Sequence, residues 1–272
     1  MDRITTFTAP TEILSSFLNS LQDLAAPVSA LDGQLAGGYL SSSGTTISVS
    51  PINKLVLGGV VASTTVATVL TPGSGGVPTL STDTWYVVWA KITSGAVAFE
   101  VEEYAGNEPD LALVYKSGDT TLRYLGSFVT YSDSGTKILP FRQLPGGVVS
   151  YNQRLDTHVL LDTLTDATAA PHDADHSLDL SVRLPPHTAS AVVRCKLNDS
   201  GSQYRFYFRN PGLTGYEGRE FDIYPGGPTQ TFYVGTVEGN GLQVLEVRTS
   251  TVTNTLTSLE VYCDGYVEIV SK

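Results

Sequence analysis

The chain has 272 residues, of which 41% are hydrophobic and 16% are charged, so it can form one large or two modest domains around a real core. Its net charge is −11, and no cluster of Lys and Arg offers the phosphate neutralisation that nucleic-acid binding needs. The 26 Gly and 14 Pro, with abundant Thr, Ser and Val, favour a mainly β protein with many turns.

The N-terminal residues MDRITTFTAP lack a basic region followed by an apolar run, so we expect no signal peptide. No stretch approaches the roughly 18 apolar residues of a membrane span, so we expect no membrane insertion. Two cysteines, Cys195 and Cys263, are too few for a disulfide scaffold, and two buried thiols are the simpler expectation. These features indicate synthesis in a cytoplasm without export by a visible signal.

A short helix is the first expected element, within an N-terminal segment that spans residues 1–44. Apolar residues at 3–4 spacing line one face of this helix, which ends near Pro27. They are Leu14, Phe17, Leu21 and Leu24. Either this face packs on the β body of its own chain, or it packs against copies of itself around an oligomer axis.

Residues 45–150 are expected to form a central antiparallel β module, after a Gly/Ser-rich link over residues 35–46. The run WYVVWAKITSGAVAFEVEEY predicts a hairpin that turns at Thr93, Ser94 and Gly95. A second hairpin is expected to turn over residues 132–135, whose sequence is SDSG.

Residues 151–272 are expected to form a C-terminal β-sandwich of the jelly-roll kind. The run SLDLSVRL alternates, and it places four apolar residues on one face: Leu178, Leu180, Val182 and Leu184. Further on we expect a hairpin through residues 198–201 and a turn at 238–241. Short strands at close turn spacing are typical of an antiparallel sandwich or jelly roll.

The segment PHDADHSLDL is the part of the sequence that most resembles a metal site. His172 and His176 stand four residues apart, as in zinc-binding helices, and Asp175 lies between them. However, Pro171 precedes them and the following residues alternate as a strand, so no shared face supplies a clear third ligand. We therefore favour a polar loop and expect no metal or other cofactor; a cation such as calcium is the alternative.

Two carboxylates, Glu100 and Glu102, lie on one face of an expected strand, a spacing that is compatible with a glycosidase. The exposed polar face of an antiparallel sheet is the commoner reason for such a pattern. The sequence has no G-x-S-x-G motif, and its Gly-rich turns lie between strands rather than before a helix. We therefore predict no enzyme activity.

An aromatic strand is expected at YRFYFR, where Arg205, Tyr207 and Arg209 share a face. Such a face can stack on sugar rings or bind an acidic glycan. The alternative is an amphipathic sandwich strand whose arginine face is exposed to solvent and binds nothing. We expect these three residues to contact a receptor or glycan.

The middle of the chain resembles a module that is common in the fibre proteins of bacteriophage virions. The resemblance lies in WYVVWAKITSGAVAF, then NEPDLALVYKSGDTTLRYLGSFVTYSDSG, and then ILPFRQ. The opening ITTFTAPTEILSSFLNSLQDLA is similar to the short helical start of such fibres. NTLTSLEVYCDGY is similar to the last strands of their terminal sandwich domains.

This resemblance implies a homotrimer without common catalytic residues that stands on the virion surface. The chain lacks a long shaft of repeats, so a tail fibre, a head fibre and a compact capsid decoration all remain open. We expect its partners to be copies of itself, another virion protein at the N-terminus and a host-surface glycan. Two other classes remain alternatives: a polysaccharide depolymerase and a carbohydrate-binding module.

Overall fold

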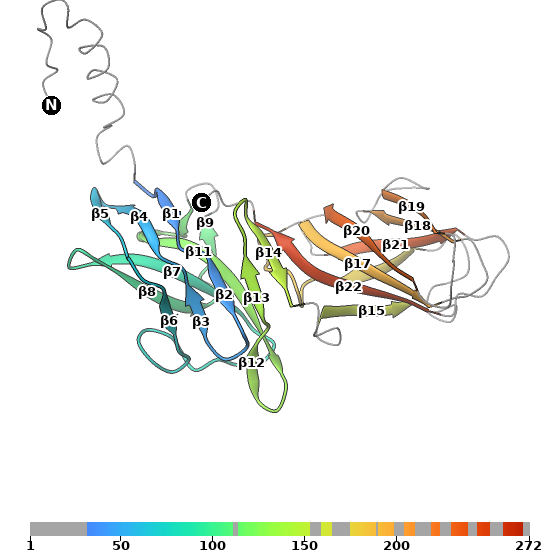
Figure 1. The fold of residues 1–272 in the computed structure, drawn as a ribbon, viewed down its shortest axis with the longest axis horizontal. Helices are drawn as coiled ribbons and strands as arrows, with labels where there is room; N and C mark the ends of the chain where they lie inside the picture. Colours follow the sequence, from blue (N-terminus) through green and yellow to red (C-terminus); the bar gives the residue numbers. More distant parts are fainter. Residues whose placement is uncertain are drawn as a thin grey trace, which may run out of the picture.

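A computed structural model of the chain describes residues 32–110, 114–152, 159–164, 175–188, 190–198, 204–209, 219–223, 230–238, 244–250 and 258–268. The expected N-terminal helix, with its apolar face, lies outside these residues. The described part is mainly β, as the composition predicts, and its paired strands are antiparallel. Figure 1 shows an elongated body, with the central module at one end and the C-terminal strands at the other.

The strands of the central module begin at Leu35. They are β1 (Leu35–Gly37), β2 (Leu40–Ser42), β3 (Ile47–Val49), β4 (Ile52–Leu57), β5 (Val60–Ala62), β6 (Thr68–Leu70), β7 (Trp85–Thr93), β8 (Ala96–Glu103), β9 (Pro109–Asp110), β10 (Tyr115–Lys116), β11 (Asp119–Ser132), β12 (Thr136–Ile138), β13 (Phe141–Gln143) and β14 (Val148–Tyr151). The C-terminal strands are β15 (Leu160–Leu164), β16 (Asp175–Asp179), β17 (Ser190–Asn198), β18 (Tyr204–Arg209), β19 (Arg219–Ile223), β20 (Gln230–Glu238), β21 (Val244–Ser250) and β22 (Ser258–Val267).

Both hairpins that the sequence predicts in the central module are confirmed. β7 pairs with β8, and Ser94 and Gly95 between them have positive φ angles of 52° and 80°, as a tight two-residue hairpin turn requires. β11 pairs with β12 across the second predicted turn. The expected Gly/Ser-rich link over residues 35–46 is wrong, because this segment contains β1 and β2, which pair with β4 and with β3 and β13.

One sheet runs from the central module into the C-terminal half, with the order β20-β17-β22-β14-β13-β2-β3-β6. Strand β14 joins the two halves, because it pairs with β13 on one side and with β22 on the other. The expected boundary at residue 150 therefore falls inside a strand, and a backbone ladder crosses from one half to the other.

The C-terminal strands form two four-stranded groups, β15-β22-β17-β20 and β16-β21-β18-β19. Their inward side chains share one core, which includes Leu178, Phe208, Cys195 and Val261. The hairpin expected through residues 198–201 is wrong, because β17 pairs with β20 and β22 whereas β18 pairs with β19 and β21. The chain crosses from one group to the other at this point.

The apolar face predicted at residues 178–184 is confirmed only in part. Leu178, Leu180 and Leu184 are buried, but Val182 is 47% exposed. The strand ends at Asp179 and the chain turns at residues 181–183, so alternation no longer fixes the direction of these side chains.

The two cysteines are free, buried thiols, as the sequence predicts. Cys195 lies in β17 and Cys263 in the neighbouring β22. Burial raises the pKa of the Cys263 thiol to about 12 and raises that of Cys195 as well, so both stay protonated at neutral pH. No helix within the described ranges is long and apolar enough to cross a membrane.

Candidate functional site

The predicted glycan-contact residues lie on β18, but the central one is not exposed. Tyr207 is only 3% exposed, and its neighbours Phe206 and Phe208 are buried as well. The prediction that Tyr207 offers an exposed aromatic face is therefore wrong, since the folded chain covers both faces of the strand here. The side chains of Arg205 and Arg209 lie outside the described part of the structure.

The His/Asp segment does not assemble a metal site among the described residues. His172 and the side chain of Asp175 lie outside them, while His176 in β16 donates from Nε2 to Asp162 Oδ2 at 2.8 Å. In the described ranges, no three His, Cys, Asp or Glu residues come close enough together to hold a metal ion. His176 therefore joins β16 to β15 through one hydrogen bond.

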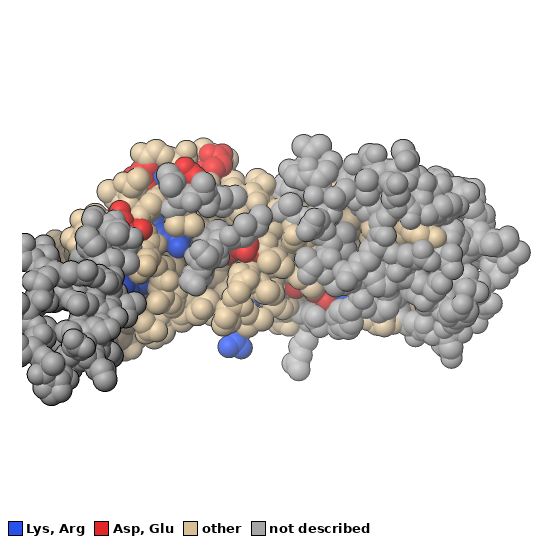
Figure 2. Space-filling view, turned by 90° about the horizontal axis from the view of Figure 1, so that it is seen from above, with Lys and Arg blue, Asp and Glu red and all other residues tan. Residues whose placement is uncertain are grey.

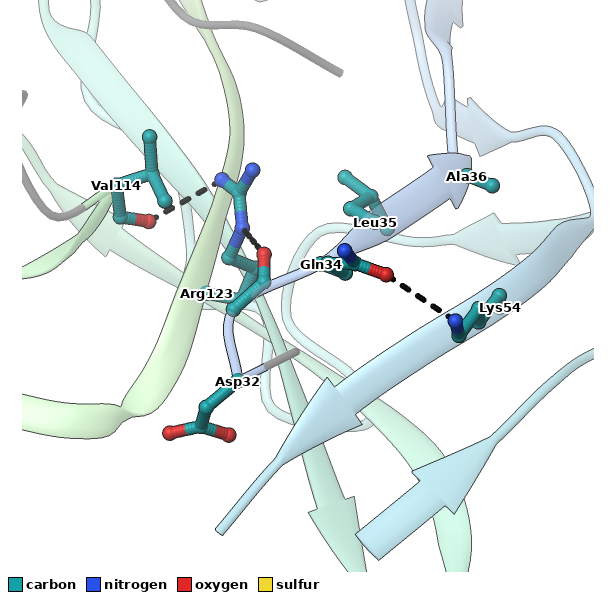
Figure 3. A pocket seen from close by; sticks show the side chains of 8 residues that line it. Asp32, Gln34, Leu35, Ala36, Lys54, Val114 and Arg123 are labelled. Atoms are coloured by element: carbon teal, nitrogen blue, oxygen red, sulfur yellow. Dashed lines mark hydrogen bonds between the residues drawn. The ribbon is translucent and has the colours of Figure 1, made fainter. Parts of the chain in front are cut away.

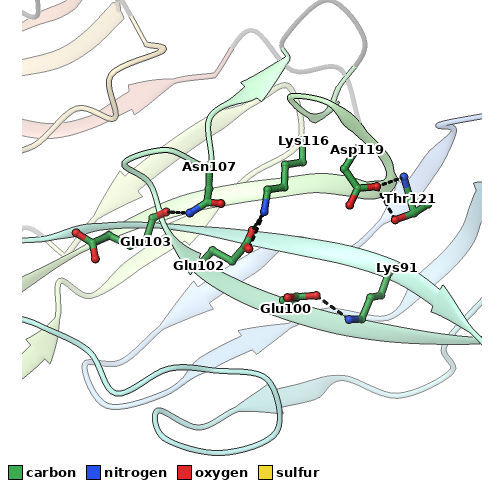
Figure 4. A network of polar contacts seen from close by, with 8 residues as sticks. All are labelled: Lys91, Glu100, Glu102, Glu103, Asn107, Lys116, Asp119 and Thr121. Carbon is green, nitrogen blue, oxygen red and sulfur yellow. Dashed lines mark hydrogen bonds and ion pairs between the residues drawn. The ribbon is translucent and has the colours of Figure 1, made fainter.

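The carboxylates of Glu100 and Glu102 are each bound to a lysine on the face of the β7–β8 hairpin (Figure 4). Lys91 Nζ lies 2.6 Å from Glu100 Oε2, and Lys116 Nζ lies 2.6 and 2.7 Å from the two oxygens of Glu102. An acid–base pair in a glycosidase needs both carboxyl groups free to reach the sugar. The observed arrangement is instead a charge-paired sheet face.

A largely buried polar cluster lies where the two halves meet, and we call it the junction network. Its members are Tyr104, Tyr124, Gln143, His187 and Glu268. Tyr104 Oη lies 3.0 Å from His187 Nδ1, and Tyr124 Oη lies 3.2 Å from His187 Nε2. Tyr124 Oη donates to Glu268 Oε1 at 2.8 Å, and Gln143 Nε2 donates to Glu268 Oε2 at 3.1 Å.

The proton positions in the junction network follow from these contacts. Because the Tyr124 hydroxyl gives its proton to Glu268, it accepts from His187 Nε2–H, and His187 Nδ1 accepts from Tyr104. Burial lowers the pKa of His187 to about 4, so the ring is neutral at pH 7. Burial also raises the pKa values of Tyr104 and Tyr124.

The junction network connects strands and holds them together rather than opening to a substrate. Tyr124 and Glu268 are 0% and 3% exposed. Gln143 in β13 also accepts from the Leu40 N–H at 2.8 Å, so β2, β11, β13 and the end of β22 are linked. Trp85 supports the same junction, because its Nε1 donates to the Ser181 carbonyl at 2.9 Å. Sequence reasoning missed this cluster because its members are spread from residue 104 to residue 268.

A pocket of about 330 Å³ lies where the described chain begins, between β1, β4 and β11 (Figure 3). Arg123, which is 2% exposed, donates from Nε to the Gly33 carbonyl at 2.7 Å and from Nη1 to the Val114 carbonyl at 3.2 Å. Burial lowers the pKa of Arg123 to about 10, so the guanidinium stays charged at neutral pH. The hydrogen bond to the Gly33 carbonyl holds the residues just before β1 against β11.

A larger hollow of about 530 Å³ lies over β2, β13 and β14. Its lining combines hydroxyl, amide and guanidinium groups with the edges of aromatic rings. The lining residues are Ser42, Ser43, Pro140, Phe141, Arg142, Leu144, Ser150, Tyr151 and Asn152. These polar groups are of the kinds that bind sugar hydroxyls.

Comparisons of the chain with protein-family models, curated proteins and solved structures find no match.

Proposed function

We propose that the chain is a structural surface protein of a tailed-bacteriophage virion, either a homotrimeric fibre or a capsid decoration. In this proposal the N-terminal segment attaches to another virion protein, and the C-terminal sandwich faces the host surface or its glycans. The resemblance of phrases in the first, middle and last parts of the sequence to those of phage fibre proteins supports this proposal.

The observation that carries the proposal is the arrangement along the long axis of the body (Figure 1). β1, the first described strand, belongs to the central module, and β18–β21 lie at the opposite end. Attachment through the residues before β1 would therefore leave the sandwich as the far end. The continuous sheet and the junction network make the connection between the two ends stiff, as a spacer requires.

The topology of the C-terminal half supports the same proposal. Two four-stranded groups, between which most successive strands alternate, have the arrangement of a jelly roll. Jelly rolls occur in viral capsid and lectin domains, so the topology suits both a virion location and glycan binding.

Light scattering behind size exclusion tests this proposal on the full chain and on a shortened chain that begins at Asp32. This start keeps β1 and the Arg123–Gly33 contact, both of which belong to the folded body. We expect the full chain to have a mass of three times 29.0 kDa. A mass of one chain at all concentrations would contradict a homotrimer.

A carbohydrate-binding module is the second candidate, and the polar hollow over β2, β13 and β14 favours it. Such a module binds glycan as a monomer. A glycan array probed with the wild-type chain and with Arg142→Ala tests this function: binding by a monomer that the substitution abolishes would replace the fibre proposal. A depolymerase would instead release reducing ends from host capsule, and Glu102→Gln would abolish that release.

A further inference from the structure

Exposed apolar side chains gather in one segment of the central module. Four valines there are 45–69% exposed, in β5, in β6 and in the loop between them. They are Val60, Val61, Val66 and Val69, which we call the valine edge. No residue from Leu55 to Thr82 carries a charge. An exposed apolar surface of this kind marks an interaction site.

Both strands of the valine edge end their sheets. Among the described strands, β5 pairs only with β4, and β6 pairs only with β3. Each therefore presents a row of backbone N–H and C=O groups that can pair with another strand. Proteins usually protect such edges by keeping the strands very short or with charged residues, proline or bulges.

Strand β8, which also ends a sheet, shows this protection. It carries Glu100 and Glu102 with their lysine partners (Figure 4). The valine edge carries no charge of either sign, so its protection is limited to the shortness of β5 and β6, which have three residues each. A contact that covers this edge would bury its exposed valines.

A groove of about 320 Å³ runs beside β6 and extends the uncharged surface to the start of β8. Its lining contains hydroxyl and apolar groups and no charged residue. The lining residues are Thr68, Val69, Leu70, Thr71, Ser74, Gly75, Val77, Val97, Ala98 and Phe99. The groove can receive side chains from a strand that pairs with the edge of β6.

The net charge of −11 favours a second copy as the occupant. Copies of an acidic chain repel one another where their carboxylates face each other, and like charges across an interface cost several kcal/mol. Figure 2 shows charged side chains distributed over the central module, with uncharged surface between them. When two copies meet through the valine edge, no like charges of this segment face each other and none of its residues is a charged group that would be buried.

The two strand edges also supply the complementarity that a ring of identical chains needs. In a ring, each chain offers one surface to the copy before it and a different surface to the copy after it. β5 and β6 are two such surfaces, joined by a loop of a few residues. An edge of one copy can therefore pair with the other edge of the next copy.

We infer that the valine edge is the surface through which copies of this chain bind one another, with a second copy as its occupant. This inference rests on the proposed homotrimer and deepens it, because it places the contact between copies in the central module. Residues 1–31 are then available for attachment to another virion protein. The shortened chain that begins at Asp32 should therefore assemble as the full chain does.

The test is the mass of the full chain carrying both Val61→Lys and Val66→Lys. We measure it by light scattering over about a 100-fold range of concentration. Val182→Lys is the matched control, because Val182 is 47% exposed and lies in the C-terminal half. We expect the wild type and the control to be trimers. The double variant should be a monomer, with a dissociation constant raised by about 100-fold or more.

The other outcomes separate this inference from the proposed function. A trimeric double variant would overturn the inference and leave the homotrimer standing, with its contact elsewhere in the chain. A monomeric wild type would overturn both. If tryptophan fluorescence shows that the lysine variant is unfolded, Val61→Thr with Val66→Thr replaces it. Threonine keeps the shape of valine, so this pair should still weaken assembly, and an unchanged dissociation constant would refute the inference.

Discussion

The buried ion pair between Arg194 and Asp264 gives the most direct test of the C-terminal half. Arg194 in β17 donates from Nε to Asp264 Oδ2 at 2.9 Å and from Nη2 to Oδ1 at 3.2 Å. The two side chains are 8% and 2% exposed, and the guanidinium lies 4.1 Å from the ring centroid of Tyr262. The pair therefore ties β17 to β22 with almost no access to water.

Substitution of Asp264 by Asn keeps the shape of the side chain but leaves the guanidinium without its opposite charge. Removal of one partner from a buried pair costs about 3–5 kcal/mol. Each 1.4 kcal/mol changes an equilibrium tenfold. The population of chains with an opened sandwich should therefore rise by about 100-fold or more in Asp264→Asn.

The chain's own residues provide separate probes of its two halves. Both thiols, Cys195 and Cys263, lie in the C-terminal half, so their reaction with a disulfide reagent reports its opening. Both tryptophans, Trp85 and Trp89, lie in β7. Trp89 is buried in the central module, whereas Trp85 donates to the Ser181 carbonyl of the C-terminal half, so their fluorescence reports the central module and its junction with that half. We expect Asp264→Asn to accelerate thiol labelling by about 100-fold in native buffer, with a smaller effect on the fluorescence transition.

Glu100→Gln is the matched control, because it breaks an ion pair whose side chains are 37% and 33% exposed. An exposed pair contributes at most about 1 kcal/mol, and this one lies far from the thiols in the sequence. Its labelling rate should stay near that of the wild type. If Asp264→Asn labels within about threefold of the wild type, the reasoning that this buried pair stabilises the sandwich is refuted.

Three further predictions concern the region where the two halves meet. Burial lowers the pKa of His187 from 6.5 to about 4, so its effect on stability is constant above pH 6.5 and becomes unfavourable as the pH falls toward 4. Urea titrations followed by tryptophan fluorescence should show a larger loss of the free energy of unfolding over this interval in the wild type than in His187→Gln; equal losses would contradict the lowered pKa of the half-buried ring. Tyr124→Phe removes the hydroxyl that joins His187 to the Glu268 carboxylate, so it should lower the free energy of unfolding by about 1–3 kcal/mol in the same titration at pH 7. Gly265→Ala places a Cβ 2.0 Å from the Val149 carbonyl oxygen, so it should separate β14 from β22 and lower the thermal midpoint by several degrees. Gly118→Ala, which also has a positive φ but meets nothing within 4 Å, should have the smaller effect.

The sequence by itself determined the local features of this protein. Branched and aromatic side chains predicted a mainly β chain, and turn residues predicted the hairpins at Ser94–Gly95 and over residues 132–135. Low cysteine content predicted two buried thiols. These features depend on a few neighbouring residues, because strand alternation and turn conformation are properties of short segments.

Only the tertiary structure decided which strands pair and which faces are covered. Two strands that follow one another in the chain, β17 and β18, lie in different sheets, although their sequences fit a hairpin. Tyr207 is buried, although the alternation of the strand predicts that its face is exposed to water. Glu100 and Glu102 each form an ion pair with a lysine. Alternation distinguishes the two faces of a strand, but residues far away in the chain determine what packs on each face. For the same reason the junction network, which unites residues 104 to 268, had no signal in the sequence.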